Sequence, residues 1–375
     1  MTDSSNELLI TMCQGREISA VYNNGKMTSV SLIDTHSSFD IGNIYVGRID
    51  NIVNNINAAF VNISDKLSCY LDLNTDELPL FVKRQSERKI CVGDEIVVQL
   101  VKEGIKTKAP VVTTAFSIAG KYVSVVRHGT GVQISKKITG KATREHIKEV
   151  LSGVSAEDKC VIARTNAVCA SDEEILSEAQ KLIERFDDIV KTSAHAGRYT
   201  VLYKELPPYL MQLRDTNAFM FDRIVTDIPS VHAEVSDYLK LFPTVSESGT
   251  FTKAELVPDR DRLNAIYKPD KYMDIIQRRI INLKSGASII IDQCEALTAI
   301  DVNSGKAVSG KRATQATFFD INVEAAKEIA YQLRLRNISG IIIIDFINQT
   351  DGDLRTKLLE ELKAAIKTDP IQTEL

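Results

Sequence analysis

Residues 287–303 read ASIIIDQCEALTAIDVN, and this stretch decides the fold of the C-terminal part of the chain. Two apolar runs, Ala287–Asp292 and Ala296–Asp301, flank the short polar connection 293–295. Isoleucine-rich runs of this length on either side of a polar connection predict two strands of an antiparallel hairpin. Because Asp301 stands at the end of the second run, we expect a carboxylate at the end of a strand.

Another strand, nearer the C-terminus, is also expected to end in an aspartate. Asn322 begins a helical pattern with alanine, isoleucine and leucine residues on one face, and this helix is expected to end near residues 337–340. The uninterrupted apolar run Gly340–Ile344 then predicts a strand that is buried on both faces. This strand ends at Asp345.

Asp301 and Asp345 would each leave a carboxylate beside a buried strand, which is unfavourable unless a cation lies nearby. If the two strands are neighbours, the carboxylates together offer the hard oxygen ligands that hold Mg²⁺, with water completing the shell. Asn303 is placed to orient Asp301. The alternative is a pair of structural aspartates that cap loops or pair with Arg334 or Arg336, and spacing alone does not decide between the two.

The residues around this acidic pair favour a phosphate-containing substrate. Between Arg278 and Arg312, six basic residues stand against three acidic ones. The turn 303–306 offers backbone N–H groups and Lys306 to a phosphate. A basic frame around an acidic metal site suits a phosphodiester and a metal ion.

The chain has 375 residues, of which 44% are hydrophobic and 26% charged. This composition is typical of two or three globular domains and excludes a disordered or fibrous chain. No apolar run approaches the ~20 residues needed to cross a bilayer, and the N-terminus lacks a signal peptide, so a cytoplasmic protein is expected. Six scattered cysteines and five histidines show no zinc-site spacing, which predicts free thiols.

The net charge of −4 conceals a basic stretch. From Lys102 to Lys148 there are ten basic residues and two acidic ones. A run of this kind is either a solvated face or a nucleic-acid-binding surface, and the sequence leaves both open.

The first half of the chain is rich in short strand patterns. The runs Glu7–Cys13, Glu17–Tyr22 and Met27–Leu32 predict a small sheet, with a tight hairpin at the Asn-Asn-Gly turn 23–25. From Gly42 onwards, short strands broken by glycine and asparagine predict a small barrel, with residues 74–89 as a loop inserted in it.

A long amphipathic helix is predicted after Ser171. Ser171 and Glu174 have the spacing of a capping box, and the apolar residues that follow have helical spacing. We interpret its apolar stripe as core packing. Prolines punctuate residues 207–275, with domain boundaries expected near 206 and 275.

Three blocks of the C-terminal part, Ile290–Lys306, Asn322–Arg336 and Gly340–Phe346, resemble the catalytic region of the ribonuclease E/G family. Residues 42–49 and 58–61 resemble that family's S1-type RNA-binding domain more weakly, so the resemblance covers most of the chain. It implies an α+β multidomain fold. The implied parts are a split RNase H-like subdomain (1–40 and 206–275), an S1-type OB barrel (41–115), a 5′-sensor subdomain (116–205) and a DNase I-like α/β catalytic subdomain (276–375).

The resemblance implies a Mg²⁺-dependent endoribonuclease specific for single-stranded RNA. The family's metal-binding pair matches Asp301 and Asp345, and its supporting asparagine matches Asn303. The metal would activate water for attack on phosphorus and leave 5′-phosphate and 3′-hydroxyl ends.

The family's RNA-binding positions on the barrel match Phe60, Tyr70 and Lys108. Aromatic side chains there would stack on bases of any sequence. The alternative for Phe60 is a place in the barrel core.

The family's pocket for a 5′-monophosphate matches Arg164 and Thr165, with a backbone contact at Gly120. An arginine fork and a hydroxyl suit a dianionic phosphate. Residues 166–170 depart from the small, glycine-containing run usual in the family, and Ser124 replaces an apolar residue.

The family typically continues through a Cys-Pro-x-Cys zinc-link into a small dimerisation domain. This motif is absent here, so neither zinc nor a zinc-linked homodimer is expected. A non-catalytic RNA-binding or ribosome-assembly protein is the alternative function, and a nucleotide phosphatase is a third. The intact aspartate pair argues against the former, and the barrel argues against the latter.

Overall fold

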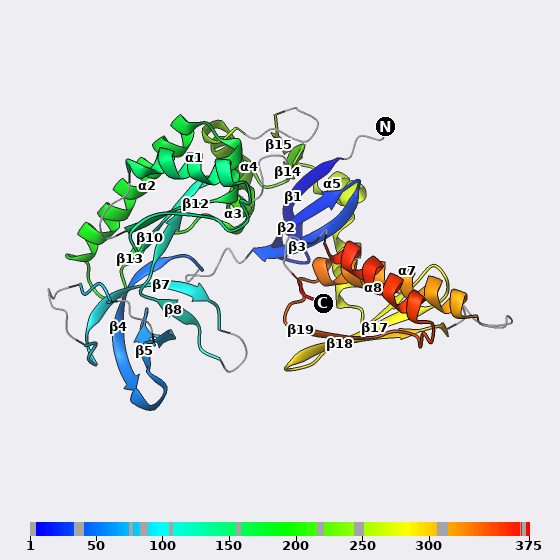
Figure 1. The fold of residues 1–375 in the computed structure, drawn as a ribbon. Coiled ribbons are helices and arrows are strands. Elements are labelled where there is room, and N and C mark those ends of the chain that lie inside the picture. The colour runs from blue at the N-terminus through cyan, green and yellow to red at the C-terminus, as the bar shows by residue number, and fades with distance from the viewer. Residues whose placement is uncertain are drawn as a thin grey trace. The chain divides into compact units, whose positions relative to one another are not determined.

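A computed structural model describes residues 5–33, 41–74, 78–82, 89–104, 108–154, 159–215, 221–243, 251–305, 314–367, 369 and 373–375. The chain divides into two compact units (Figure 1). The first combines Met1–Asp34 with Phe219–Leu375, and the second is Thr35–Ala218.

The first unit contains a five-stranded mixed sheet in the order β15-β14-β1-β2-β3. The antiparallel strands are β1 (Asn6–Cys13), β2 (Arg16–Asn23) and β3 (Lys26–Ile33), and β14 (Arg223–Thr226) and β15 (Lys253–Leu256) add in parallel. The turn between β2 and β3 holds Asn24 and Gly25 at φ of 50° and 72°, which confirms the predicted hairpin. This unit also contains α4 (Pro229–Leu241), α5 (Arg260–Tyr267) and α6 (Pro269–Gln277).

The second sheet of this unit has four strands. Their order is β16 (Ile280–Asn282), β17 (Ser288–Gln293), β18 (Leu297–Asn303) and β19 (Ile341–Asp345). β17 and β18 are antiparallel, as the hairpin prediction requires, and β18 and β19 are parallel neighbours. The helices α7 (Gln315–Leu335) and α8 (Gly352–Ile366) pack together on one side of the sheet (Figure 1).

The predicted start of α7 was wrong. The helix begins at Gln315, where the Thr314 hydroxyl accepts a hydrogen bond from the Thr317 amide at 3.2 Å. Asn322 resembles a cap in the sequence but lies inside the helix, fully buried. The helix ends at Leu335, and Asn337 and Gly340 have positive φ, as expected near its end.

The prediction that β19 is buried on both faces was also wrong. Ile341 and Ile343 are 65% and 55% exposed, whereas Ile342 and Ile344 pack into the cores beneath the helices. An uninterrupted apolar run does not reveal which face a sheet buries. Here α7 and α8 cover only one face.

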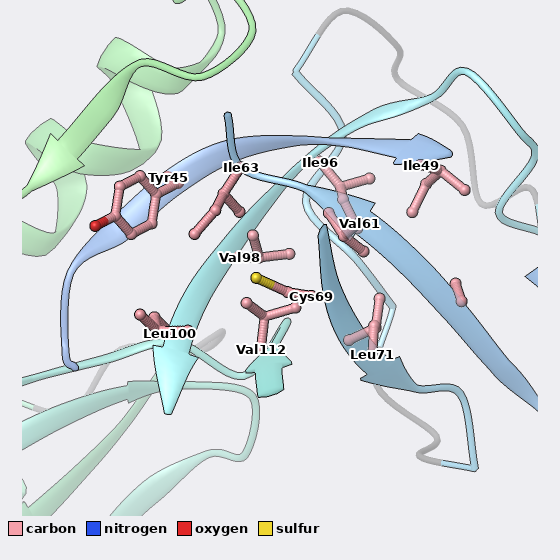
Figure 2. Close-up of a cluster of buried hydrophobic side chains, with 11 residues drawn as sticks. Tyr45, Ile49, Val61, Ile63, Cys69, Leu71, Ile96, Val98, Leu100 and Val112 are labelled. Carbon is pink, nitrogen blue, oxygen red and sulfur yellow. The ribbon is translucent and has the colours of Figure 1, made fainter. Parts of the chain in front are cut away.

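The predicted barrel is present in the second unit. Its strands are β4 (Ile44–Val53), β5 (Ala58–Asn62), β6 (Ser68–Asp72), β7 (Glu95–Lys102) and β8 (Val111–Thr113), with the turn η1 (Asn54–Ile56) between β4 and β5. The order β4-β5-β6-β8-β7 closes through a pairing of β4 with β7. Alternate side chains from these strands fill a common interior (Figure 2). Of the predicted loop 74–89, the residues 75–77 and 83–88 lie outside the described residues.

A further four-stranded sheet, in the order β11-β12-β10-β9, follows in the second unit. It consists of β9 (Ser117–Ala119), β10 (Val123–Arg127), β11 (Gly131–Ile134) and β12 (Lys159–Ala163), with α1 (Lys141–Ser152), η2 (Thr165–Cys169) and α2 (Asp172–Ser193) around it. The capping box of α2 is confirmed, since Ser171 and Glu174 exchange side-chain hydrogen bonds with each other's amides. The strand β13 (Val201–Tyr203) pairs with β4, and α3 (Pro208–Asp215) follows it.

The six cysteines are free thiols, as their spacing predicts. Across the described ranges, no helix combines the length and the apolar character that crossing a membrane requires.

Candidate functional site

Asp301 and Asp345 lie opposite each other on two parallel strands. The register of β18 and β19 pairs the two residues directly. Adjacent strands lie about 4.8 Å apart, and residues paired in register project from the same face. Both residues are exposed, whereas the flanking Ile300 and Val302 are buried in the core. The sheet therefore presents two neighbouring carboxylates on its uncovered face.

Asn303 lies on the same face, two residues beyond Asp301. Its Nδ2 donates to Asp301 Oδ2 at 2.7 Å. This hydrogen bond restrains the carboxylate of Asp301 and leaves its other oxygen available. It is the contact that an orienting role requires.

The alternative of structural ion pairs receives no support from Arg336. Its guanidinium donates to Gln332 and to the backbone carbonyls of Ile275 and Arg278. Within the described residues, no lysine or arginine forms a salt bridge with Asp301 or Asp345. Lys306 and the rest of the segment 306–313 lie outside those residues.

The donor set at this edge of the sheet fits Mg²⁺. Two carboxylates and a neighbouring amide supply the hard oxygen atoms that this ion prefers, and Mg²⁺ in proteins usually keeps several waters. The described part of the chain holds no group of three or more His, Cys, Asp or Glu side chains arranged for a metal. Asp301 and Asp345 are the two carboxylates at this edge that could hold such an ion.

Asn322 is a residue of this site that the sequence interpretation missed. Its Nδ2 donates to the carbonyl of Ile347 at 2.8 Å, and its Oδ1 accepts from the amide of Ile347 at 3.0 Å. Ile347 follows β19 two residues after Asp345. A polar residue at a buried position of a helix was the feature that could have indicated this contact.

Phe60 and Tyr70 form a pair on the outer face of the barrel. They are register partners in β5 and β6, and their rings meet edge to face with centroids 6.3 Å apart. Both are half-buried, whereas the alternating Val61, Cys69 and Leu71 point into the interior (Figure 2). The alternative that Phe60 belongs to the barrel core is therefore wrong.

Lys108 lies just before the segment that pairs with Tyr70. The amide of Tyr70 donates to the carbonyl of Pro110 at 2.7 Å, which joins the segment after Lys108 to β6. Lys108 is exposed. Its amine can therefore reach solvent near the aromatic pair.

The basic stretch does not form one uniform surface. Lys121 is 2% exposed, and Arg144 donates to the carbonyls of Ser135 and Ile138, so both are structural. A second group remains exposed: Lys102, Lys108, Lys136, Lys137, Lys141 and Lys148. Lys106 lies outside the described residues.

The structure brings together Arg164, Thr165 and Gly120. Arg164 Nη1 donates to the carbonyl of Gly120, and Nη2 donates to Asp215 Oδ1 at 2.7 Å. The hydroxyl of Thr165 lies 3.5 Å from that of Ser135. Arg164 is partly accessible, with 24% of its side chain exposed. Arg164 thus contacts Gly120 and Asp215, and the hydroxyl of the adjacent Thr165 lies against that of Ser135.

Gly120 stands where the backbone wraps around a carboxylate. Glu178 of α2 accepts from the amides of Lys121, Tyr122 and Val123 at 2.8, 2.7 and 3.0 Å. A Cβ on Gly120 would lie 2.4 Å from the Glu178 carboxyl carbon, so only glycine fits. The Gly120 amide donates to the carbonyl of Val123 at 2.8 Å, so binding a ligand through this N–H would require that bond to break. Sequence interpretation missed Glu178.

Comparison with known proteins identifies the family to which the chain belongs. The profile of the Ribonuclease E/G family matches residues 117–375. Ribonuclease G of Salmonella typhimurium is 28% identical over 380 residues, which cover 98% of this chain and 76% of the relative. Ribonuclease E of a Nostoc species is 30% identical over 98% of this chain and 53% of its own length.

A relative from Buchnera aphidicola, named putative ribonuclease E, is 32% identical over 87% of this chain and 83% of its own length. The family profile covers more than half of the chain and includes both strands that carry the aspartate pair. The chain therefore belongs to the ribonuclease E/G family of endoribonucleases.

Proposed function

We propose that this protein is a Mg²⁺-dependent endoribonuclease that cleaves single-stranded RNA during RNA processing or decay, leaving 5′-phosphate and 3′-hydroxyl ends. The observation that carries the proposal is the direct pairing of Asp301 with Asp345 on neighbouring strands. Family membership supports RNA as the substrate.

Asp301 and Asp345 hold the ion, and Asn303 fixes the carboxylate of Asp301 through Oδ2. When bound, Mg²⁺ offsets the charge of the phosphodiester and promotes attack of water on phosphorus. The Asn322–Ile347 contact holds the chain that leaves β19, and so restrains Asp345.

The outer face of the barrel binds the RNA. Phe60 and Tyr70 are half-buried and aromatic, so each supplies a stacking surface worth about 1–3 kcal/mol per base. Lys108 contributes a charge for the backbone phosphates. Stacking and phosphate contacts tolerate any RNA sequence.

Arg164 and Thr165 bind the 5′-monophosphate of the RNA, and Gly120 supports this site through its carbonyl, which accepts from Arg164. The guanidinium and hydroxyl are donors of the kind that a dianionic phosphate prefers. RNA carrying a 5′-monophosphate is therefore the preferred substrate.

The four subdomains that the family resemblance implies correspond, in this proposal, to the four sheets of the two units. The mixed sheet β15-β14-β1-β2-β3 is an RNase H-like subdomain, the barrel is an S1-type domain, and the sheet of β9–β12 is the 5′-sensor. The sheet β16–β19 with α7 and α8 is the DNase I-like catalytic subdomain. We place the protein in the cytoplasm.

A labelled RNA tests the proposal. A single-stranded RNA carrying a 5′ label is incubated with the protein with Mg²⁺ or with a chelator, and the ends of the products are determined. Internal cleavage only with Mg²⁺, leaving 3′-hydroxyl ends, supports the proposal. Binding without cleavage would favour the alternative, a non-catalytic RNA-binding or ribosome-assembly protein.

A further inference from the structure

A carboxylate that no sequence pattern singled out lies beside Arg164. Asp215 ends α3, and its Oδ1 accepts from Arg164 Nη2 at 2.7 Å and from Arg214 Nε at 2.8 Å. Arg214 Nη2 lies 3.4 Å from Oδ2 of the same carboxylate. One side chain thus bridges two guanidinium groups.

The Arg214 side of this bridge is firmly fixed. Only 7% of the Arg214 side chain is exposed, and its Nη1 donates to Glu205 Oε1 at 2.9 Å and to the carbonyl of Ala119 at 3.1 Å. Asn166 Nδ2 donates to the Arg214 carbonyl at 3.1 Å. A buried guanidinium with four hydrogen bonds, two of them to Asp215, therefore holds the Asp215 carboxylate in place.

Two anchors hold the guanidinium of Arg164. One N–H goes to the carbonyl of Gly120 and one to Asp215. A guanidinium has five N–H donors, so three remain for a ligand. Because the group is planar and held at both terminal nitrogens, the orientation of the three remaining donors is fixed.

The charges of this cluster balance. Arg164 and Arg214 carry two positive charges, and Asp215 and Glu205 carry two negative ones. A cluster with no net charge attracts an anion of any kind only weakly. Binding of a phosphate here therefore depends on directed hydrogen bonds. A terminal phosphate offers three oxygen acceptors, whereas an internal phosphodiester offers two unbridged oxygens and one charge.

We propose that Asp215 is a positioning residue that makes the Arg164 pocket selective for a terminal phosphate over the internal phosphodiesters of RNA. It acts by orienting Arg164 and by cancelling charge that would attract any phosphate. This inference rests on the proposed 5′-phosphate pocket.

The experiment compares cleavage of two RNAs of the same sequence, one with a 5′-monophosphate and one with a 5′-hydroxyl. The measured quantity is the ratio of their kcat/KM values. Because one preparation cuts both RNAs, the ratio does not depend on the folded fraction. Asp215→Asn should lower the ratio about tenfold, which corresponds to the loss of one charge-assisted hydrogen bond.

Three further variants sharpen the test. Asp215→Glu keeps the charge and should retain most of the ratio. In an Arg164→Ala background, Asp215→Asn should change nothing further, because Asp215 acts through Arg164. Asp172→Asn is the matched control, since Asp172 pairs with His146 and is 49% exposed, against 46% for Asp215.

The outcomes separate this inference from the proposed pocket. A wild-type ratio of one would overturn both. A wild-type preference that Asp215→Asn leaves intact would overturn the role of Asp215 alone. A ratio that rises in Asp215→Asn would also overturn it, because Asp215 would then be a competitor of the phosphate.

Discussion

Asn322 and Ile347 are joined by two hydrogen bonds, one from the asparagine side chain to the Ile347 carbonyl and one from the Ile347 amide to the side chain. Asn322 is fully buried in α7, and Ile347 lies just beyond Asp345. The pair ties the helix to the segment that leaves the aspartate-bearing strand. The position of Asp345 therefore depends on a helix residue distant in sequence.

Asn322→Leu should destabilise the protein and impair catalysis. It leaves the half-buried N–H and C=O groups of Ile347 without these partners, at a cost of up to about 1–3 kcal/mol each. It should also lower kcat for RNA cleavage more than it raises KM, because Asp345 loses its restraint. Urea unfolding and steady-state kinetics measure the two effects.

Gln332→Leu is the control for this prediction. Gln332 lies in the same helix, is 1% exposed, and bonds to Glu328 and Arg336. It should reduce stability with little effect on kcat. Equal kcat values for the two variants at a temperature where both are folded would contradict the proposed restraint.

Gly120 and Glu178 should show strong energetic coupling. Gly120→Ala drives a Cβ into the Glu178 carboxyl group, and Glu178→Ala removes the acceptor of three backbone amides. Each should cost roughly 3 kcal/mol in the free energy of unfolding. In the double variant the second change should cost much less, because the clash and the acceptor vanish together. Additive costs in urea unfolding would show that the two residues do not share one site.

Phe60→Ala and Tyr70→Ala should each weaken RNA binding by about 1–3 kcal/mol with little change in the melting temperature. The reason is that both rings lie outside the barrel core. Asn62→Ala, two residues further along the same face of β5, is the control and should bind normally. If the two variants unfold the barrel, but the fraction that stays folded binds RNA as tightly as wild type does, then both rings have a structural role instead.

The stabilising effect of Asp215 should disappear in acid. Burial alone would raise the pKa of Asp215, but hydrogen bonds from Arg214 and Arg164 outweigh it and lower the pKa below the ordinary 3.8. A lowered pKa in the folded state stabilises the protein above the unfolded value, and this stabilisation is lost as the pH falls through the folded value. The difference in unfolding free energy between wild type and Asp215→Asn should therefore be constant near neutrality and shrink below pH 3.8. If the difference in unfolding free energy grew on acidification, this prediction would be wrong.

Local patterns predicted those features that neighbouring residues determine. The hairpin 288–303, the Asn24-Gly25 turn and the capping box of Ser171 each depend on residues close in sequence, and all are present. Asp301 and Asp345 can pair only if their strands are neighbours in the sheet. The sequence indicated the two strands but did not show that they are neighbours, which the structure does.

Features that depend on distant partners were not predicted. Asn322 resembles a helix cap because asparagine favours that position, yet its side chain bonds to Ile347. The apolar run of β19 does not indicate its exposed face, and only the placement of α7 and α8 decides it. Glu178 and Asp215 belong to no motif, since their partners come from other elements of the second unit.

The most direct test of the catalytic site compares four proteins on one single-stranded RNA. Cleavage and binding are measured in parallel across a Mg²⁺ titration for wild type, Asp301→Asn, Asp345→Asn and Asp292→Asn. Asp292 is the control, because it lies in the same sheet but pairs with Arg279. We expect wild type and Asp292→Asn to cleave, and Asp301→Asn and Asp345→Asn to bind RNA without cleaving it. Cleavage by either of these two variants at the wild-type rate and Mg²⁺ requirement would contradict the assignment of the aspartate pair.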